Sequence, residues 1–487
     1  MTDRLNAADC LLEPPLKRGL EDHPALLSVD GSLSYAELAA MANRCANLFT
    51  GLGAEPQARI LLLLHDRPGF FIAYLGAMKA GLVPVALNVR LSASDLGFII
   101  GDSGAKILLV EPDLLALVEQ LPAEQREKLT VLTCPDALAA QLASQPDRFT
   151  SVLLPPEAMA LWMYTSGTTG HPKAVVHAIG SLPTATRYFG PLFGVGPQDR
   201  IYCTSRLFFA FSLGHCLLAA LPLGATVILR PDWPAPELVA ETARRWRPTI
   251  MLSVPTMYRN LLDGGQADSG AFDSVRLFLS AGERLPARVF GRWQASTGAA
   301  ICEGVGATET LMMFLGNRPD RARPGVSGQP FPDTEIELRD ENGVVITTPG
   351  TPGTAFVRCP SLAREYWRQP DKTAAVFRDG WYGTGDMFTR DENGAFSHEG
   401  RADDMLKISG QWVSPLEIEA VALEHDQVSE AAVVGIRTGD GLMRLAMCLQ
   451  TPAADRRRLE KELAAAITAR LSIYKCPRRF IYLDAMP

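Results

Sequence analysis

The chain has 487 residues, of which 47% are hydrophobic and 21% are charged, and its formal net charge is −7. This balance is that of an ordinary globular protein of about two to four domains. The acidic net charge argues against a nucleic-acid or anionic-membrane partner bound by phosphate neutralisation. The nine cysteines are scattered without a C-x-x-C pair, which favours buried free thiols over a zinc site or a disulfide framework.

The N-terminus shows no targeting segment. Residues 1–18 mix charged side chains and have no apolar core of signal-peptide length. No uncharged apolar run reaches membrane-spanning length, because residues 65–67 and Lys79 interrupt the most apolar region. We therefore expect a cytoplasmic protein with no membrane partner.

Strands and helices alternate in the first part of the chain. Ser34 is a predicted helix N-cap, and apolar spacing continues from it to about residue 48. Strands are then predicted at 59–64, 83–87 and 105–111, with helices near 69–80 and 93–101 between them. This alternation is typical of a parallel sheet covered by helices.

A loop rich in hydrogen-bond donors follows the apolar run 159–163. Its sequence, YTSGTTGHPK, combines glycines that allow close approach to the backbone with hydroxyl groups and the positive charge of Lys173. These features favour a nucleotide polyphosphate site over a flexible surface connection of similar composition. The loop is not a Walker A loop, because His171 and Pro172 separate Gly170 from Lys173.

With this loop the sequence resembles the adenylate-forming acyl- and aryl-CoA ligases, which are related to firefly luciferase and to the adenylation domains of peptide synthetases. The resemblance covers nearly the whole chain, with Ala174 standing where the family usually has glycine. It implies that the loop binds the β- and γ-phosphates of ATP. The residues so implied are Thr165, Ser166, Gly167, Thr168, Thr169, Gly170 and Lys173.

A second run of strands at 200–204, 225–229, 249–254 and 274–279, with a helix at 236–246 and another from 255, predicts a second doubly wound sheet. Turns at 280–283 and 303–309 end two of its strands, where ligands of such sheets collect. The resemblance implies that Thr308 contacts the α-phosphate and that Glu309 binds Mg²⁺. It also implies that the adenine lies between turns that contain Ala281, Gly282, Glu283, Glu303 and Gly304.

Short alternating runs between 334 and 358 are parted by turn residues and predict a small antiparallel β unit at about 334–400. The resemblance implies that Asp386 binds the ribose hydroxyls, that Arg401 contacts the nucleotide and that Asp403 is a hinge. We therefore expect an N-terminal adenylate-forming domain at 1–402 and a small α+β lid domain at 403–487. Within the lid, the resemblance implies that Ser409, Gly410 and Trp412 lie on the coenzyme A side.

The segments 206–215 and 310–317 resemble the benzoate-CoA ligase branch, although core packing is the plain alternative for so apolar a sequence. The acid pocket implied by this match consists of Ala210, Phe211, His215, Gly306, Met312 and Met313. Phe211 replaces a usual tyrosine and Met312 a usual histidine. We therefore expect an apolar pocket that prefers benzoate and its halogenated or alkylated relatives to hydroxylated acids, with His215 as the one side chain that could turn inward.

The predicted function is that of an ATP-dependent aryl-CoA ligase, with Thr308, Glu309 and Lys173 as catalytic residues and with ATP, Mg²⁺ and coenzyme A as cofactors. An adenylation protein that loads a phosphopantetheinyl carrier protein is the alternative, and a homodimer is left open. A luciferase-like oxygenase has no support in the sequence. The family's C-terminal lysine would follow Pro487, so we expect the natural chain to continue, since a chain that ended there would favour an idle binder.

Overall fold

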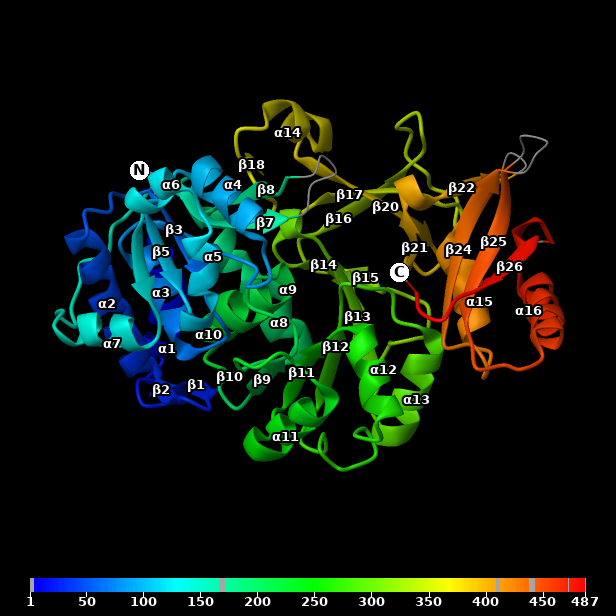
Figure 1. The fold of residues 1–487 in the computed structure, drawn as a ribbon, viewed down its shortest axis with the longest axis horizontal. Helices are drawn as coiled ribbons and strands as arrows, with labels where there is room; N and C mark the ends of the chain where they lie inside the picture. The colour runs from blue at the N-terminus through cyan, green and yellow to red at the C-terminus, as the bar shows by residue number, and fades with distance from the viewer. Residues whose placement is uncertain (1–3, 166–170, 409–410, 438–442, 472, 487) are drawn as a thin grey trace.

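The computed structural model describes residues 4–165, 171–408, 411–437, 443–471 and 473–486. Two large sheets with covering helices form most of the molecule, and the C-terminal elements lie to one side of it (Figure 1). This confirms the predicted α/β architecture of two doubly wound sheets. None of the described helices is long and apolar enough to cross a membrane.

The first large sheet has seven strands in the order β18-β8-β7-β4-β3-β5-β6. Its strands are β3 (Arg59–Leu63), β4 (Val83–Ala86), β5 (Ile107–Val110), β6 (Thr130–Thr133), β7 (Met159–Thr165), β8 (Lys173–Ala178) and β18 (Glu365–Tyr366). β3 to β7 pair in parallel, whereas β8 runs antiparallel to both β7 and β18. The predicted phosphate loop therefore connects two adjacent strands of this sheet.

The helices of this part of the chain are α1 (Asp9–Lys17), α2 (Tyr35–Gly51), α3 (Pro68–Lys79), α4 (Ala93–Ser103), α5 (Leu115–Glu119), α6 (Ala123–Glu127) and α7 (Asp136–Ala143). The predicted cap of α2 is confirmed, because the Glu37 backbone N–H donates to Ser34 Oγ at 3.2 Å and the Ser34 N–H donates to the Glu37 carboxylate at 2.7 Å. Such a reciprocal pair satisfies two N–H groups that the first turn leaves without intrahelical partners.

The second large sheet has nine strands in the order β15-β14-β13-β12-β11-β9-β10-β1-β2. Its strands are β1 (Pro24–Ser28), β2 (Gly31–Ser34), β9 (Arg200–Cys203), β10 (Thr226–Leu229), β11 (Ile250–Ser253), β12 (Leu277–Ser280), β13 (Ile301–Gly306), β14 (Met313–Gly316) and β15 (Gln329–Pro330). Its helices include α8 (Thr186–Phe193), α9 (Ala210–Ser212), the π-helical turn η3 (Leu213–Ala219), α10 (Ala220–Leu223), α11 (Pro236–Trp246), α12 (Pro255–Asp263) and α13 (Ala287–Thr297). The N-terminal strands β1 and β2 thus belong to the second sheet.

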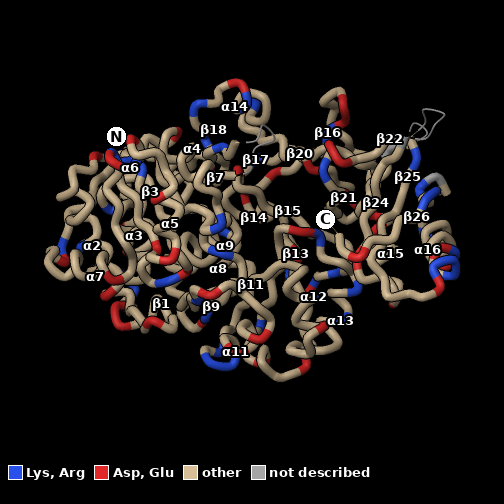
Figure 2. The backbone as a smooth tube through the Cα atoms, in the orientation of Figure 1, with Lys and Arg blue, Asp and Glu red and all other residues tan. Residues whose placement is uncertain are grey.

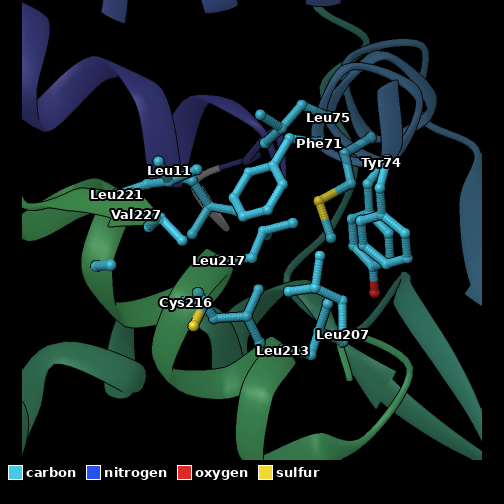
Figure 3. Packing of buried hydrophobic residues seen from close by; sticks show 14 of the residues in the cluster. Leu11, Phe71, Tyr74, Leu75, Leu207, Leu213, Cys216, Leu217, Leu221 and Val227 are labelled. Atoms are coloured by element: carbon cyan, nitrogen blue, oxygen red, sulfur yellow. The ribbon is translucent and has the colours of Figure 1, made fainter. Parts of the chain in front are cut away.

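One hydrophobic cluster joins the two sheets. It contains Leu62 of β3 together with Val227 of β10. In the same cluster, Phe71 and Leu75 of α3 and Leu217 of η3 point toward one another (Figure 3). Residues 70–78 of α3 are all buried, as expected for a helix that is apolar on every side. This packing fixes η3, which carries His215, against the core.

A five-stranded antiparallel unit follows, with β16 (Glu335–Arg339), β17 (Gly353–Arg358), β19 (Phe377–Arg378), β20 (Trp381–Arg390) and β21 (Phe396–Arg401), and α14 (Pro370–Val376) lies beside it. Short 3-10 turns occur at η1 (Pro112–Leu114), η2 (Ile179–Ala185), η4 (Thr308–Thr310), η5 (Ala402–Asp404) and η6 (Ile473–Lys475). The predicted antiparallel β unit is present, and its first two strands pair as β16–β17.

The C-terminal elements surround a hydrophobic cluster of their own, which includes Ile418, Leu445, Met447 and Leu459. They are β22 (Leu406–Ile408), β23 (Gln411–Val413), α15 (Pro415–Leu423), β24 (Glu430–Arg437), β25 (Met443–Gln450), α16 (Arg456–Arg470) and β26 (Arg479–Tyr482). Arg259 of α12 contacts Glu430 at 3.4 Å across the junction with the larger part. Acidic and basic residues are interspersed along the chain (Figure 2), so the net charge of −7 is not concentrated in one segment.

Candidate active site

A cavity of about 510 Å³ opens at the carboxyl ends of β11, β12 and β13. It is lined by every residue predicted for the acid pocket and by part of the predicted adenine turn. The lining residues are Ser205, Phe209, Ala210, Phe211, His215, Val254, Ala281, Gly282, Glu283, Gly306, Ala307, Thr308, Leu311, Met312 and Met313. The structure therefore brings the two predicted groups, which are far apart in the sequence, into one cavity.

His215 stands at the acid end of this cavity, and its hydrogen-bonding capacity is fully used. Nδ1 lies 2.7 Å from the Phe211 carbonyl, which can only accept, so Nδ1 carries the proton. Nε2 is then an acceptor, and the Tyr188 hydroxyl donates to it at 2.6 Å. Burial lowers the pKa of His215 to about 4. The neutral imidazole therefore lines the cavity with both ring nitrogens already hydrogen-bonded, and it has no free nitrogen for a polar group of a ligand.

The segment that enters the acid pocket is anchored by a buried ion pair. Arg206 Nη1 lies 3.5 Å from Asp66, whose other oxygen accepts a hydrogen bond from the Leu207 N–H at 3.2 Å. Arg206 also donates to the Arg230 carbonyl at 2.7 Å. Burial raises the pKa of Asp66 to about 6, although the charge of Arg206 opposes this shift. These contacts tie the start of the pocket segment to the end of β3 in the first sheet.

The opposite wall is made by a strained turn at Leu311, whose φ of +60° is unusual for a residue with a side chain. The Met312 N–H donates to the Thr310 carbonyl at 2.6 Å, which closes a γ-turn around Leu311. Thr310 Oγ1 stabilises the turn because it lies 2.8 Å from the Met312 carbonyl and accepts from the Ala307 N–H at 3.0 Å. A Cβ on Gly306 would lie 3.0 Å from the Met312 carbonyl oxygen, so a side chain at this position would crowd the backbone of the turn.

A second cavity of about 460 Å³ shares Phe209, Ala210 and Thr308 with the first. Thr165, the last residue of β7, also lines it. Thr165 pairs with Lys173 across β7 and β8, so the predicted phosphate loop begins and ends here. The central loop residues, Ser166, Gly167, Thr168, Thr169 and Gly170, lie outside the described residues.

The predicted catalytic charges meet at Glu309. Its Oε1 lies 3.2 Å from Lys173 Nζ and accepts a hydrogen bond from the Tyr366 hydroxyl at 2.7 Å. The Lys173 ammonium also lies 3.9 Å from the centre of the Tyr366 ring, within cation–π range. Burial, reinforced by the charge of Glu309, raises the pKa of Tyr366. The phenol therefore remains a hydrogen-bond donor to the carboxylate.

The backbone of the same turn is held by β8 and by the segment before β18. His177, on the same strand as Lys173, donates from Nε2 to the Thr308 carbonyl at 2.9 Å. The Ala363 N–H donates to the Glu309 carbonyl at 2.7 Å. His177 is fully buried, and burial lowers its pKa to about 4. Strand β8 thus positions the backbone of Thr308 as well as the side chain of Glu309.

The donor set at Glu309 fits a magnesium ion that arrives with a nucleotide. Among the described residues there is no group of three or more His, Cys, Asp or Glu side chains able to hold a metal ion. Mg²⁺ prefers oxygen ligands and is commonly bound by one or two carboxylates together with substrate phosphates and water. A single carboxylate beside Thr308, at the edge of the two cavities, matches that mode of binding.

Two residues predicted beside the adenine, Glu303 and Gly304, contact the chain behind the cavity and are not among its lining residues. Glu303 is buried and accepts hydrogen bonds from the Leu285 N–H at 2.9 Å and from Ser327 Oγ at 2.7 Å. Burial raises the pKa of its carboxyl group. A Cβ on Gly304 would lie 2.2 Å from Met313 Sδ. The structure thus places Glu303 behind the turn predicted to bind the adenine, and Gly304 against Met313, which lines the predicted acid pocket.

Asp386 and Arg401 lie opposite each other on β20 and β21, with Arg401 Nη1 3.6 Å from Asp386 Oδ1. Arg401 also donates to the Thr384 carbonyl at 3.0 Å. Asp403 is exposed in the turn η5 between β21 and β22. Of the predicted lid residues, Ser409 and Gly410 lie outside the described residues, and Trp412 is part of β23, where its side chain is not described.

Sequence reasoning missed four residues that position the site: His177, Tyr188, Thr310 and Tyr366. Each acts through a contact with a residue distant in the chain or with the backbone, and such contacts leave no local pattern. The one local sign of such a role was that Thr310 directly follows Glu309 in the sequence. Tyr366 reaches the site only because β18 pairs with β8.

Comparison with known proteins places the chain in a family. The model of the AMP-binding enzyme family matches residues 17–367, and that of the AMP-binding enzyme C-terminal domain matches residues 417–487. The chain therefore belongs to the AMP-binding enzyme family.

Two curated relatives and one solved structure are similar over nearly their whole length. A 3-hydroxybenzoate–CoA ligase of Aromatoleum sp. (strain CIB) is 44% identical, with 99% of this chain and 94% of the relative covered. A 3-hydroxybenzoate–CoA/4-hydroxybenzoate–CoA ligase of Thauera aromatica is 43% identical, with the same coverage of 99% and 94%. The crystal structure of a benzoate CoA ligase from Burkholderia xenovorans LB400 is 33% identical, with a TM-score of 0.91 and coverage of 99% of this chain and 97% of that one.

Proposed function

We propose that the protein is an ATP-dependent aryl-CoA ligase, which activates a benzoate-like acid as its acyl-AMP and transfers the acyl group to coenzyme A. The observation that supports this most is the shared cavity. Its apolar end is formed by Phe211, His215 and Met312, and its other side carries Thr308 and the turn that contains Gly282. A flat apolar acid and a nucleotide can therefore meet in one enclosed space.

Formation of an acyl-adenylate requires the acid and the nucleotide to bind next to each other in this cavity. A carboxylate is a poor acyl donor because its leaving group is oxide. Attack of a carboxylate oxygen on the α-phosphorus of ATP forms the acyl-adenylate and breaks the bond to pyrophosphate. The thiolate of coenzyme A then attacks the acyl carbon and releases AMP. Positioning and neutralisation of charge account for most of the catalysis in such a reaction.

The chain's own residues have distinct roles in this scheme. Thr308 donates a hydrogen bond to a phosphate oxygen, Lys173 neutralises phosphate charge at the end of the loop, and Glu309 provides the carboxylate ligand for Mg²⁺. When bound, Mg²⁺ neutralises negative charge on the phosphate oxygens. Asp386 and Arg401, which face each other on β20 and β21, bind the ribose side of the nucleotide. Residues 403–487 form the lid, with Asp403 as its hinge.

The acid class follows from the walls of the pocket. Burying a benzene ring stabilises binding by roughly 25 cal/mol per Å² of apolar surface. A ring hydroxyl that finds no partner costs ~1 to 3 kcal/mol, which is about one to two orders of magnitude in specificity. Because His215 is already satisfied by Phe211 and Tyr188, the pocket supports a preference for benzoate or a halobenzoate.

The names of the two curated relatives point instead to a hydroxylated ring, so the test must compare both. We propose measuring pyrophosphate exchange by the full-length protein with benzoate, a halobenzoate, 3-hydroxybenzoate, 4-hydroxybenzoate, 2-aminobenzoate and a medium-chain fatty acid. The highest kcat/KM for an unsubstituted or halogenated ring would support the apolar pocket. Preference for 3-hydroxybenzoate would identify a polar partner such as Ser205 or Glu283, both of which line the cavity. Preference for the fatty acid would refute the aryl assignment.

A further inference from the structure

We propose that Tyr366 is a positioning residue that keeps the Glu309 carboxylate in its metal-binding place when Lys173 leaves it for the nucleotide. The inference deepens the proposed function and rests on it. It assigns a role to a tyrosine outside the phosphate loop and outside both cavities.

The first observation is that one side chain contacts both members of the charge pair. The Tyr366 hydroxyl donates to Glu309 Oε1 at 2.7 Å, and its ring centre lies 3.9 Å from Lys173 Nζ. Lys173 itself lies 3.2 Å from the same oxygen, Oε1. Both contacts thus end on one carboxylate oxygen, Oε1, and the Tyr382 hydroxyl also contacts the Glu309 carboxylate.

The second observation is that Tyr366 is rigidly held from the buried side. It is 2% exposed, it belongs to a hydrophobic cluster with Val175 and Ala363, and its ring centre lies 5.7 Å from that of Phe377. Its backbone pairs with Val175 of β8, and its N–H donates to Thr373 Oγ1 at 3.0 Å. A phenol fixed in this way is pre-organised, so little conformational freedom is lost when it holds the carboxylate.

Binding of a nucleotide changes the partners of Lys173. The Lys173 ammonium cannot pair equally with Glu309 and with a phosphate oxygen, because bound phosphates place a larger negative charge on the side away from Glu309. If Lys173 were the only partner of Glu309, the carboxylate would either retain the lysine or follow it. The hydrogen bond from Tyr366 keeps Glu309 in place while Lys173 moves. A hydrogen bond to a charged group is strong enough for this role.

The test uses Mn²⁺ as a paramagnetic probe in place of Mg²⁺. The affinity of Mn²⁺ for the complex of the full-length protein with ATP is measured by electron paramagnetic resonance, without any acid substrate, for wild type and for Tyr366→Phe. We expect the affinity of Mn²⁺ to fall by about 10-fold or more, in line with the loss of a hydrogen bond to a charged group. The affinity of ATP measured without a divalent cation should change by less than about 2-fold.

Two comparisons separate positioning from a general structural effect. Tyr35→Phe removes another buried phenol, which donates to the Ala225 carbonyl at 2.7 Å far from the site, and it should leave Mn²⁺ binding unchanged. In a Glu309→Gln background, Tyr366→Phe should have no further effect on Mn²⁺, because the carboxylate it positions is gone.

Unchanged Mn²⁺ affinity in Tyr366→Phe, or an equal loss in the Glu309→Gln background, would overturn the inference. Absence of Mn²⁺ binding to the wild-type complex with ATP would overturn it as well. If the wild type binds Mn²⁺ with ATP but forms no aryl-adenylate from any aromatic acid, the proposed function fails while the role of Tyr366 is still decided by the Mn²⁺ measurements.

Discussion

The hydrogen bond between His215 and Tyr188 predicts a coupling free energy between the two side chains. Its size follows from the number of buried polar groups that each substitution leaves without a partner. His215 is 0% exposed and Tyr188 is 4% exposed, and their 2.6 Å contact is joined by the His215 hydrogen bond to the Phe211 carbonyl. Tyr188→Phe removes this partner from two groups, His215 Nε2 and the Met313 N–H, which also contacts the Tyr188 hydroxyl. His215→Leu leaves two, the Tyr188 hydroxyl and the Phe211 carbonyl. The double variant leaves the Phe211 carbonyl and the Met313 N–H without these partners, two groups fewer than the sum of the single variants.

At ~1 to 3 kcal/mol for each buried group without a partner, the double variant should be more stable than the sum of the single effects by about 2 to 6 kcal/mol. The measurement is a double-mutant cycle of urea unfolding, followed by intrinsic fluorescence, on wild type, both single variants and the double variant. Additivity within about 0.5 kcal/mol would show that the two side chains do not interact, and it would remove the reason for treating His215 as a pocket residue with both ring nitrogens already hydrogen-bonded.

Three further predictions concern the nucleotide, the hinge and pH. Lys173→Ala should weaken adenylation while cooperative unfolding is preserved, because Lys173 supplies charge and lies outside the hydrophobic core; unchanged pyrophosphate exchange would contradict this role. Asp403→Pro fixes φ at the proposed hinge and should slow thioester formation more than adenylate formation, and equal losses in the two half-reactions, measured separately, would argue against a hinge. Burial lowers the pKa of His177 and His215 from 6.5 to about 4, so the stability they contribute is fully present above pH 6.5 and is lost as the pH falls toward 4. The melting temperature should therefore decrease from pH 7.5 to pH 5, and a variant with both histidines replaced by glutamine should show a smaller decrease; equal decreases would refute this assignment.

Local patterns predicted those features that depend on neighbouring residues. The cap at Ser34 and the helix Pro236–Trp246 agree with the sequence because both follow from spacing within one element. The turns predicted to bind the acid and the adenine line one cavity, as expected where the strand ends of a doubly wound sheet converge at the same edge.

Features that depend on long-range packing were not predictable from such patterns. Strands β1 and β2 join the second sheet because β1 pairs with β10, and nothing in residues 24–34 encodes that choice. Glu303 is predicted beside the adenine by the family resemblance, and no local pattern shows that its carboxylate also accepts hydrogen bonds from Leu285 and Ser327. Tyr366 supports Glu309 across a strand pair that joins residues 175 and 366, a separation that no local motif spans.

Product formation with free coenzyme A tests whether the protein is an aryl-CoA ligase. The full-length protein is incubated with benzoate, ATP, Mg²⁺ and coenzyme A, and the products are identified by mass spectrometry, with a phosphopantetheinyl carrier protein offered in a parallel reaction. We expect benzoyl-CoA together with AMP and pyrophosphate, with each co-substrate required. Transfer to the carrier but not to coenzyme A, or thioester formation only from fatty acids, would contradict it.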